Sequence, residues 1–397
     1  MATFYVGYGH KSIGDCGSTT IFVEGISMLA AKAIQDYRLY NGQEASTRYI
    51  DFATQTFIDP VGSAESHTIL ESWRSLYLEG IALLKEQLSQ EYPCEEGEDP
   101  KSHIKAINAR AFDIMRGFLP AGASTNLAWH TELRHAADHL MNLRHHPLAE
   151  VRLITEVIEE ALIERFPSSF STKRYEATEA YIESWMRDDY YFQGDDTYRG
   201  LDHVKLLHSG IRHDVLDHYR NALASRPPKT ELPKFLAEAG SMTFAFLLDF
   251  GSFRDIQRHR AVIQRMPLLT ADYGMSEWYL KRLPEDFRKK AVSVTEDLLK
   301  QIKNISQSPE VRQYYMPMGM QVPCRLTGDI PALVYLVELR SGIAVHATLR
   351  IVAQQTGPLM LEELGSHGLV LHLDMSEDRF NAKRGKDDIV EKTTQVS

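Results

Sequence analysis

Cysteine is scarce in this sequence and forms no recognisable motif. The three cysteines, Cys16, Cys94 and Cys324, lie far apart and include no CxxC pair, which favours a reducing cytoplasm as the location. The first residues, MATFYVGYGHKS, lack the basic segment and apolar core of a secretory signal, so no such signal is expected.

Long apolar runs, excess positive charge and the common phosphate-loop motifs are missing as well. No apolar run reaches the ~18 residues of a membrane span. Lys and Arg number 44 against 54 Asp and Glu, a net charge of −10, whereas a general nucleic-acid binder carries a basic surface. Neither a membrane nor a nucleic acid is therefore an expected partner, although a local basic pocket for a small phosphate remains compatible. The chain also lacks GxGxxG, GxxxxGKS/T and GxSxG, so no Rossmann phosphate loop is expected.

Hydrophobic residues make up 43% and charged residues 25% of the 397 residues, as in a folded chain long enough for two or three domains. Apolar residues recur at helical spacing in segments 65–88, 105–118, 132–143, 149–165, 287–302 and 332–339. Fewer segments favour strands, namely 19–23, 204–207, 242–248 and 367–373. This balance predicts an α+β fold, mainly helical with small antiparallel sheets, rather than a doubly wound sheet.

The two halves of the chain carry the same order of patterns. STTIFVEGISMLAAKAIQDYR, ending at Arg38, parallels GSMTFAFLLDFGSFRDIQRHR, ending at Arg260. Each runs from a short apolar strand into a helix that carries Ile-Gln and closes on Arg, and residues 118–144 parallel 315–340 in the same way. Because order and spacing agree twice, we predict two diverged copies of one domain at 1–190 and 202–375. A charged flexible tail is expected at 376–397.

Two motifs carry groups suited to anions. Gln257-Arg258-His259-Arg260 closes a helical run, and guanidiniums offer the planar donors that phosphates and carboxylates prefer. In the first copy, Glu44-Ala45-Ser46-Thr47-Arg48-Tyr49 follows a glycine turn, and a hydroxyl, backbone N–H groups and an Arg can cradle a phosphate there. Taken alone, the first motif is equally compatible with a solvated basic helix face, and the second fits an ordinary turn better.

Together the two motifs resemble the flavin-dependent thymidylate synthases, whose signature places Arg-His-Arg ahead of Glu, Ser, Arg and Tyr. Gly9-His10-Lys11-Ser12 leads to Asp15, where the family usually has Glu, and Arg116 and Arg144 match later family motifs. The resemblance covers most of both halves. It implies an α+β fold made of two diverged copies of a thymidylate-synthase-complementing-type domain.

The family normally has one such domain per chain and assembles as a homotetramer with its sites between subunits. Here the signature is divided between the copies. The second copy keeps Arg258–Arg260, Arg340 and Glu238, and the first keeps His10, Ser12, Glu44, Ser46, Arg48, Arg116, Arg134 and Arg144. The resemblance therefore implies that a complete site joins the second copy to the first, in a homodimer that mimics the tetramer, with one FAD and one dUMP per chain. The reverse pairing, of Asp36–Arg38 with Met266–Thr270, is expected to bind either ligand poorly.

The resemblance also implies the reaction, which is reductive methylation of dUMP to dTMP with methylenetetrahydrofolate, FAD and NADPH. It assigns nucleotide binding to Ser46, Thr47, Arg48, Arg116 and Arg258. It assigns FAD binding to Ser12, Glu44, Arg134, Glu238, Arg258, His259 and Arg260. Arg340 or Arg144 is expected at the uracil edge, where a guanidinium favours ionisation of N3. No metal is expected.

Two alternatives stay open. The chain could be a non-catalytic nucleotide- or flavin-binding paralogue that serves an intact enzyme, or it could methylate another pyrimidine nucleotide. The metal-like spacing of His130, His135 and His139 fits helix-surface histidines better, because a di-iron bundle needs two such motifs and further carboxylates. His213-Asp214 resembles a metal-dependent phosphohydrolase motif but has no clear partner ligands elsewhere in the sequence.

The motif at residues 44–49 generates a direct test. Arg48→Ala removes one charge-assisted phosphate contact, which is expected to cost about 1.5–3 kcal/mol, or roughly ten- to a hundred-fold in dUMP affinity. Retention of flavin should be nearly unchanged. Calorimetric titration with dUMP checks this, and unchanged affinity would reduce the Ser46–Arg48 segment to a turn.

Overall fold

The computed structural model describes residues 11–47, 50–94, 96–97, 99–170 and 173–377, so His10, Arg48, Tyr49 and the predicted tail from 378 onward lie outside the described residues. The first copy contains η1 (Lys11–Cys16), β1 (Ser18–Ser27), α2 (Met28–Gln35), β2 (Asn41–Glu44), α3 (Ala64–Glu91), α4 (Pro100–Met115), η3 (Arg116–Phe118), β3 (Ser124–Glu132), α5 (Leu133–Leu143), α6 (Ala149–Arg165), α7 (Pro167–Phe170) and α8 (Glu176–Asp188). The second contains η4 (Asp196–Tyr198), β4 (Lys205–Ser209), α9 (His213–His218), α10 (Arg220–Ala224), η5 (Lys234–Ala239), β5 (Ser241–Asp249), α11 (Phe250–Ile256), β6 (Ile263–Gln264), α12 (Glu277–Lys281), α13 (Glu285–Ile305), α14 (Pro309–Arg312), η6 (Gln313–Tyr315), β7 (Gln321–Asp329), α15 (Ile330–Ser341), α16 (Ala347–Leu364) and η7 (Gly365–His367).

Two small antiparallel sheets repeat the same topology. The first has the order β1-β3-β2 and the second has the order β4-β5-β7-β6. Strands β5, β7 and β6 therefore correspond to β1, β3 and β2, and β4 is an additional edge strand of the second copy. The α+β class and the internal duplication that the sequence predicts are thus visible in the order of strands.

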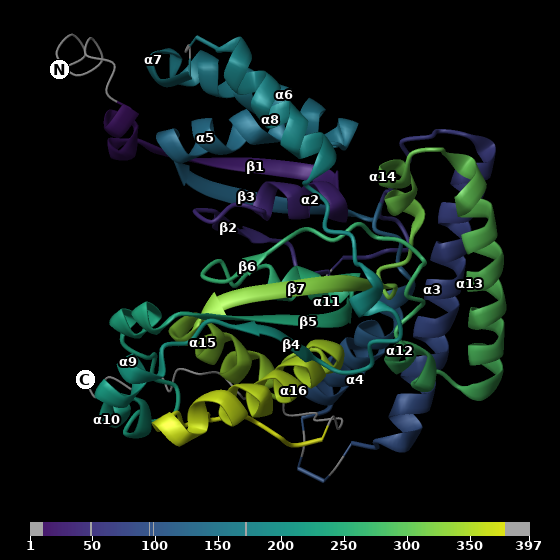
Figure 1. The fold of residues 1–397 in the computed structure, drawn as a ribbon. Helices are drawn as coiled ribbons and strands as arrows, with labels where there is room; N and C mark the ends of the chain where they lie inside the picture. Colours follow the sequence, from purple (N-terminus) through teal and green to yellow (C-terminus); the bar gives the residue numbers. More distant parts are fainter. Residues whose placement is uncertain (1–10, 48–49, 95, 98, 171–172, 378–397) are drawn as a thin grey trace, which may run out of the picture.

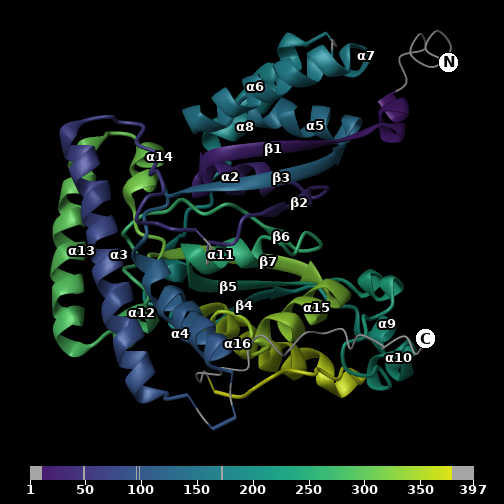
Figure 2. The ribbon, with the colours of Figure 1, turned by 180° about the vertical axis from the view of Figure 1, so that it is seen from behind.

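The two sheets lie one above the other, and each is covered on its outer side by its own helices (Figure 1). Helices α5, α6 and α8 cover the first sheet, and α15 and α16 cover the second. The long helices α3 and α13 run side by side at one end of the molecule, as the view from behind also shows (Figure 2). The main apolar core contains buried residues of both copies, including Trp73, Trp129 and Phe246.

A local two-fold relation joins the copies at two prolines. Pro120 faces Pro317 in an antiparallel bridge. On one side the Ala121 N–H donates to the Met316 carbonyl at 2.9 Å, and on the other the Met318 N–H donates to the Leu119 carbonyl at 2.8 Å. The sequence parallel between 118–144 and 315–340 therefore corresponds to segments that pair with each other directly.

Helices α2 and α11 begin beside this junction, each at a capping side chain that hydrogen-bonds to a second side chain. In one copy the cap is the hydroxyl and its partner is the acid, and in the other copy the two are exchanged. Ser27 caps α2, and its hydroxyl donates to Glu150 Oε2 at 2.6 Å. At the corresponding place Asp249 caps α11 and accepts from the Thr348 hydroxyl at 2.5 Å. Each copy thus keeps one acid and one hydroxyl but places them on opposite partners, so similar backbones present different polar surfaces.

Each copy also forms a hydrogen bond to the other away from the two prolines. The Tyr314 hydroxyl of the second copy donates to Glu150 Oε2 of the first at 2.8 Å. In the second contact, His346 at the start of α16 approaches the end of α4, and its Nε2 atom lies 3.1 Å from the Asp113 carbonyl oxygen. These contacts fix the relative position of the two copies and hence of any site between them.

The six helices predicted from apolar spacing are present, and those at 65–88, 287–302 and 332–339 are longer than predicted. The strand predicted at 367–373 is wrong, because that segment is irregular after η7. Side chains of α15 take backbone donors at its end and just beyond: the His372 N–H donates to Glu338 Oε1, and the Asp374 N–H donates to the Ser341 hydroxyl. Strands β3 and β7, the centre of each three-stranded unit, were not predicted.

Two glycines at the junction provide a test of this packing. A Cβ on Gly122 would lie 2.7 Å from the Tyr314 carbonyl oxygen, and one on Gly319 would lie 2.8 Å from the Gly117 carbonyl oxygen. Backbone cannot move aside easily, so Gly122→Ala and Gly319→Ala should each lower the free energy of unfolding by about 1–3 kcal/mol. The matched control is Gly365→Ala, whose Cβ meets nothing within 4 Å. Urea unfolding of the three variants checks this, and equal stability of all three would refute the close approach.

Candidate functional site between the two copies

The ends of α2 and α11 meet where the two sheets face each other. Both helices begin at a side-chain cap, Ser27 and Asp249. Gln35 is the last residue of α2, and Gln257 directly follows the last residue of α11. The Gln257 Nε2 donates to the Lys32 carbonyl at 3.2 Å and so ties the end of α11 to α2. This contact brings the segment after α11, Arg258–Arg260, beside the segment of the first copy that leads into β2.

A buried carboxylate joins these helix ends by charge. Lys32 Nζ donates to Glu44 Oε2 at 2.6 Å, Arg254 donates to Glu44 Oε1 at 2.5 Å, and Gln35 Nε2 adds a bond at 3.0 Å. Burial opposes the charge on Glu44, but the two cations hold the pKa of its carboxyl below the usual range. Burial lowers the pKa of Lys32 to about 8, with Glu44 acting in the opposite direction. The Glu44 carboxylate is therefore bound by the protein itself.

The Arg-His-Arg motif presents two exposed guanidiniums around a buried imidazole. Arg258 lies 3.5 Å from Asp255, and Arg260 lies over the Tyr40 ring. His259 is 7% exposed and accepts at Nε2 from the Arg340 Nε at 2.7 Å. Burial and the Arg340 guanidinium lower the pKa of His259 to about 3, so the imidazole is neutral and carries its proton on Nδ1.

Two adjoining cavities lie along this junction. The smaller, about 90 Å³, is lined by Tyr40, Gly42, Gln43 and Glu44 of the first copy and Arg258 of the second, together with Gln35, Gln257 and Arg260. Here the structure brings Arg258 and Arg260 of the second copy's Arg-His-Arg motif together with Glu44 of the first copy. Ser46 is exposed and Thr47 half-buried just beyond it, and Arg48 lies outside the described residues.

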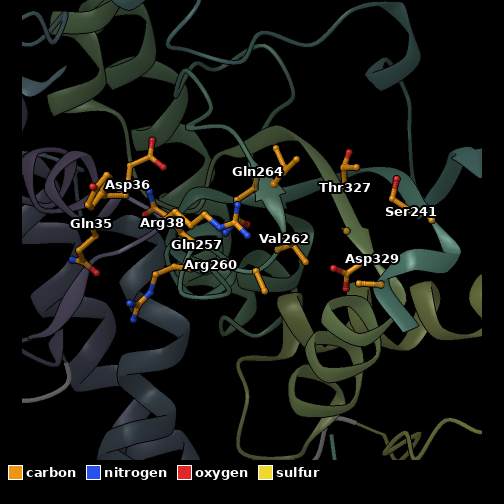
Figure 3. Close-up of a pocket in the computed structure, with 16 residues that line it drawn as sticks. Gln35, Asp36, Arg38, Ser241, Gln257, Arg260, Val262, Gln264, Thr327 and Asp329 are labelled. Carbon is orange, nitrogen blue, oxygen red and sulfur yellow. The ribbon is translucent and has the colours of Figure 1, made fainter. Parts of the chain in front are cut away.

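The larger cavity, about 560 Å³, opens on the other side of Gln257. Gln35–Arg38 of the first copy form one wall, and the start of β5, residues 261–264 and the end of β7 form the other. Figure 3 shows Asp36 and Arg38 on one side and Ser241, Thr327 and Asp329 on the other. Its volume is within the range of small-molecule sites. The sequence analysis considered a reverse pairing of Asp36–Arg38 with Met266–Thr270. Asp36–Arg38 line this cavity, whereas Met266–Thr270 do not.

Three predicted arginines have partners within the fold. Arg116 donates to the Ser252 hydroxyl at 2.7 Å, which links η3 to α11. Arg144 forms ion pairs with Glu159 and Glu179 among α5, α6 and α8, and it lines neither cavity. Arg134 pairs with Asp15 at 2.6 Å.

Arg340 and Glu238 also lie beside the cavities rather than in them. Arg340 contacts His259 and the Asp255 carbonyl, so it acts on the motif itself. Glu238 is exposed in η5, next to the cavity-lining Ala237. Nothing is described of the Ser12 side chain. The sequence analysis missed Lys32 and Arg254, although the repeat places both at the same position, five residues after the Ser27 and Asp249 caps.

The histidine patterns form one candidate metal group within the described residues. Asp15, Glu132 and His135 bring one ligand atom each within 4.8 Å of one another. The Arg134 guanidinium already holds Asp15 at 2.6 Å, and such exposed acidic groups are common without a metal. His139 is instead buried, with Nε2 2.9 Å from the Ile34 carbonyl.

Comparison with known proteins agrees with this architecture. Residues 2–168 match the family model described as thymidylate synthase complementing protein. A flavin-dependent thymidylate synthase of Pyrococcus furiosus is 28% identical over 89 residues, which cover 21% of this chain and 36% of that protein.

Longer matches extend through both copies. A UPF0159 protein of Chlamydia muridarum is 25% identical over 401 residues, covering 87% of this chain and 75% of the relative. A UPF0159 protein of Thermoplasma acidophilum is 22% identical over 418 residues, covering 88% and 83%. These lengths are consistent with a duplicated domain. Among the described residues, no helix is long and apolar enough to cross a membrane.

The buried charges around Glu44 give a stability prediction. Glu44→Gln leaves two buried cations without their anion and should cost about 3–5 kcal/mol of unfolding free energy. Lys32→Met should cost less, because Glu44 keeps Arg254 and Gln35. Urea unfolding at neutral pH compares the two variants, and equal losses would contradict the central role of the carboxylate.

The same charges predict a pH dependence. The pKa of Lys32 falls from 10.5 to about 8 on folding, so the unfolded chain binds more protons between these values and stability should rise with pH there. The rise should be smaller in Lys32→Met. An identical profile in the two proteins would show that Lys32 keeps its ordinary pKa.

Proposed function

We propose that the chain is a flavin-dependent thymidylate synthase that reductively methylates dUMP at the junction between its two copies. The observation that carries this proposal is the meeting of Arg258–Arg260 of the second copy with Gly42–Glu44 of the first, in one chain and around adjoining cavities. The family match of residues 2–168 and the partial match to a flavin-dependent thymidylate synthase support it.

The residues present fit an anionic cofactor. Arg258 and Arg260 are exposed, and their guanidiniums offer planar donors for the phosphates of FAD. FAD, reduced by NADPH, would supply the hydride, and methylenetetrahydrofolate would supply the carbon. The protein contributes fixed charge and orientation. Because Arg340 holds Nε2, the neutral His259 has only its Nδ1–H to donate.

The nucleotide phosphate is assigned to the segment after β2, where Ser46 and Thr47 follow Glu44 in sequence. Glu44 acts there through Lys32 and Arg254, which it holds in place, and not as a free cofactor ligand. Arg116 likewise acts as a positioning residue through Ser252 on α11. Arg340 is the candidate that remains closest to the reacting groups, because it contacts the motif histidine.

A second function is favoured by one specific observation. The Glu44 carboxylate is fully engaged by Lys32, Arg254 and Gln35, so one cofactor contact implied by the resemblance is already satisfied within the chain. A non-catalytic paralogue that binds nucleotide or flavin and partners an intact enzyme is consistent with that loss. The third possibility, methylation of another pyrimidine nucleotide, would use the same residues, so this observation does not bear on it.

Flavin retention and genetic rescue test the proposal together. The purified full chain should retain about one FAD per chain on gel filtration, and its gene should support growth of a thymidine auxotroph without thymidine. Arg258→Ala should abolish both, because it removes an exposed guanidinium from the smaller cavity. The matched control is Arg212→Ala, which removes an exposed guanidinium whose ion-pair partner among the described residues is Asp214, and it should behave as wild type.

The outcomes separate the candidates. A colourless protein that does not retain added FAD would contradict the flavoenzyme proposal. Flavin retention without rescue would favour the non-catalytic partner or another pyrimidine substrate. If the Arg258→Ala variant still rescues the auxotroph, the active site does not lie at the junction.

A further inference from the structure

Strand β1 forms an open edge of the first sheet. It pairs with β3 on one side, and its register runs without a break from Ser18 to Val23. Within the described residues no strand pairs with its other side. The side chains of Ser18, Thr20 and Phe22 are exposed, and Phe22 is 73% exposed. An unpaired edge of this length is a template on which a further strand can form.

The duplicated fold provides an internal comparison for this edge. Strands β1 and β5 each follow a six-residue 3-10 helix and one glycine. Ser18 then pairs with the last residue of β3, and Ser241 pairs with the last residue of β7. Because the two strands start in the same register, Phe22 of β1 corresponds to Ala245 of β5.

In the second copy the corresponding edge is occupied. Strand β4 pairs with β5, with Lys205 opposite Ala245, and the Gly210 N–H donates to the Ser241 carbonyl at 2.9 Å. Ala245 is fully buried, in one apolar cluster with side chains of segment 192–198. The same strand geometry therefore accepts a further strand on this side, and no described element supplies one to β1.

The backbone groups on the open side of β1 follow from the alternation along the strand. The Leu133 N–H donates to the Gly17 carbonyl at 2.9 Å, so residue 17 bonds toward β3. Because this direction alternates in an antiparallel strand, Ser18, Thr20 and Phe22 direct their N–H and C=O groups outward. In the described part of the chain, these outward groups have no backbone partner.

The edge of β1 also lacks the features that keep sheet edges apart. Residues 18–23 include no charged residue and no proline. By contrast, β4 carries Lys205 and a bulge, and β2 and β6 have only four and two residues. The chain has a net charge of −10, so an uncharged edge is a surface that a second identical chain can approach without charge repulsion.

We propose that the outer edge of β1 binds a second copy of this chain, whose own β1 pairs with it antiparallel about a two-fold axis at Thr20. Ser18 then lies opposite Phe22 of the partner subunit, and Thr20 lies opposite Thr20 of the partner subunit. All three outward-facing residues form hydrogen-bonded pairs in this register, and the two three-stranded sheets join into one. No residue of β1 lines either cavity, so this interface does not rest on the proposed reaction.

Sedimentation velocity of the full chain, over a wide range of concentration, tests the proposal. The wild type should form a dimer with twice the 45.2 kDa mass of the chain. Thr20→Pro removes an N–H that faces outward, so it leaves the bonds between β1 and β3 in place and should abolish the dimer. Phe22→Lys puts a charge in place of an exposed apolar side chain and should weaken the dimer by roughly ten-fold or more.

Ile263→Lys is the matched control. Ile263 is 70% exposed and lies on β6, an edge strand of the other sheet, so this variant should remain as dimeric as the wild type. Urea unfolding of the three variants checks that each is folded. Because the Phe22 side chain is exposed, Phe22→Lys is expected to fold even if Thr20→Pro does not.

Two outcomes overturn the proposal. A wild-type chain that stays monomeric at every concentration would show that a second copy does not cover this edge. A dimer that persists in folded Phe22→Lys and Thr20→Pro, or that Ile263→Lys weakens equally, would place the interface elsewhere. Since no flavin or nucleotide is used, failure of FAD retention would contradict the proposed reaction and leave this result standing.

Discussion

The Glu44 carboxylate is the interaction on which the junction depends. It is buried between Lys32 on α2 and Arg254 on α11, one cation from each copy. A buried charge that loses its partner costs several kcal/mol, so the carboxylate requires both helix ends to be in place. The segments that follow these helices, Gln35–Arg38 and Gln257–Arg260, line both cavities. Charge pairing across the copies thus positions the groups available for ligands.

Duplication in one chain has allowed the two faces of this junction to become different. The backbone keeps a local two-fold relation at Pro120 and Pro317, whereas the side chains do not follow it. The exchange of acid and hydroxyl between the two helix caps shows this at one place, and the unequal cavities show it at another. A symmetric assembly of single-domain chains has identical sites, and a fused pair is free to assign separate ligands to its two faces.

The sequence predicted the duplication and most helices, because these depend on local patterns that recur in both copies. The resemblance implied a site shared by Arg258–Arg260 and Glu44, and in the structure Arg258, Arg260 and Glu44 line one cavity. It missed the central strands β3 and β7, whose alternation of buried and exposed residues lies inside stretches treated as spacers. The strand predicted at 367–373 is wrong, and the Glu338 side chain, remote in sequence, takes the His372 N–H there instead of a neighbouring strand. The ion pairs of Arg144 could not be predicted from the sequence either, because their partners Glu159 and Glu179 lie on other helices. Lys32 and Arg254 were within reach, because the aligned repeats place a cation at the same position in both copies.

The central claim is that one ligand site is built jointly by the two copies of a single chain. Hydrogen–deuterium exchange of the full chain, measured with and without FAD, tests it most directly. The account predicts that FAD slows exchange in residues 257–264 of the second copy and in residues 35–44 of the first, with the same dependence on FAD concentration. Protection confined to one copy, or absent from both segments while FAD is bound, would contradict it.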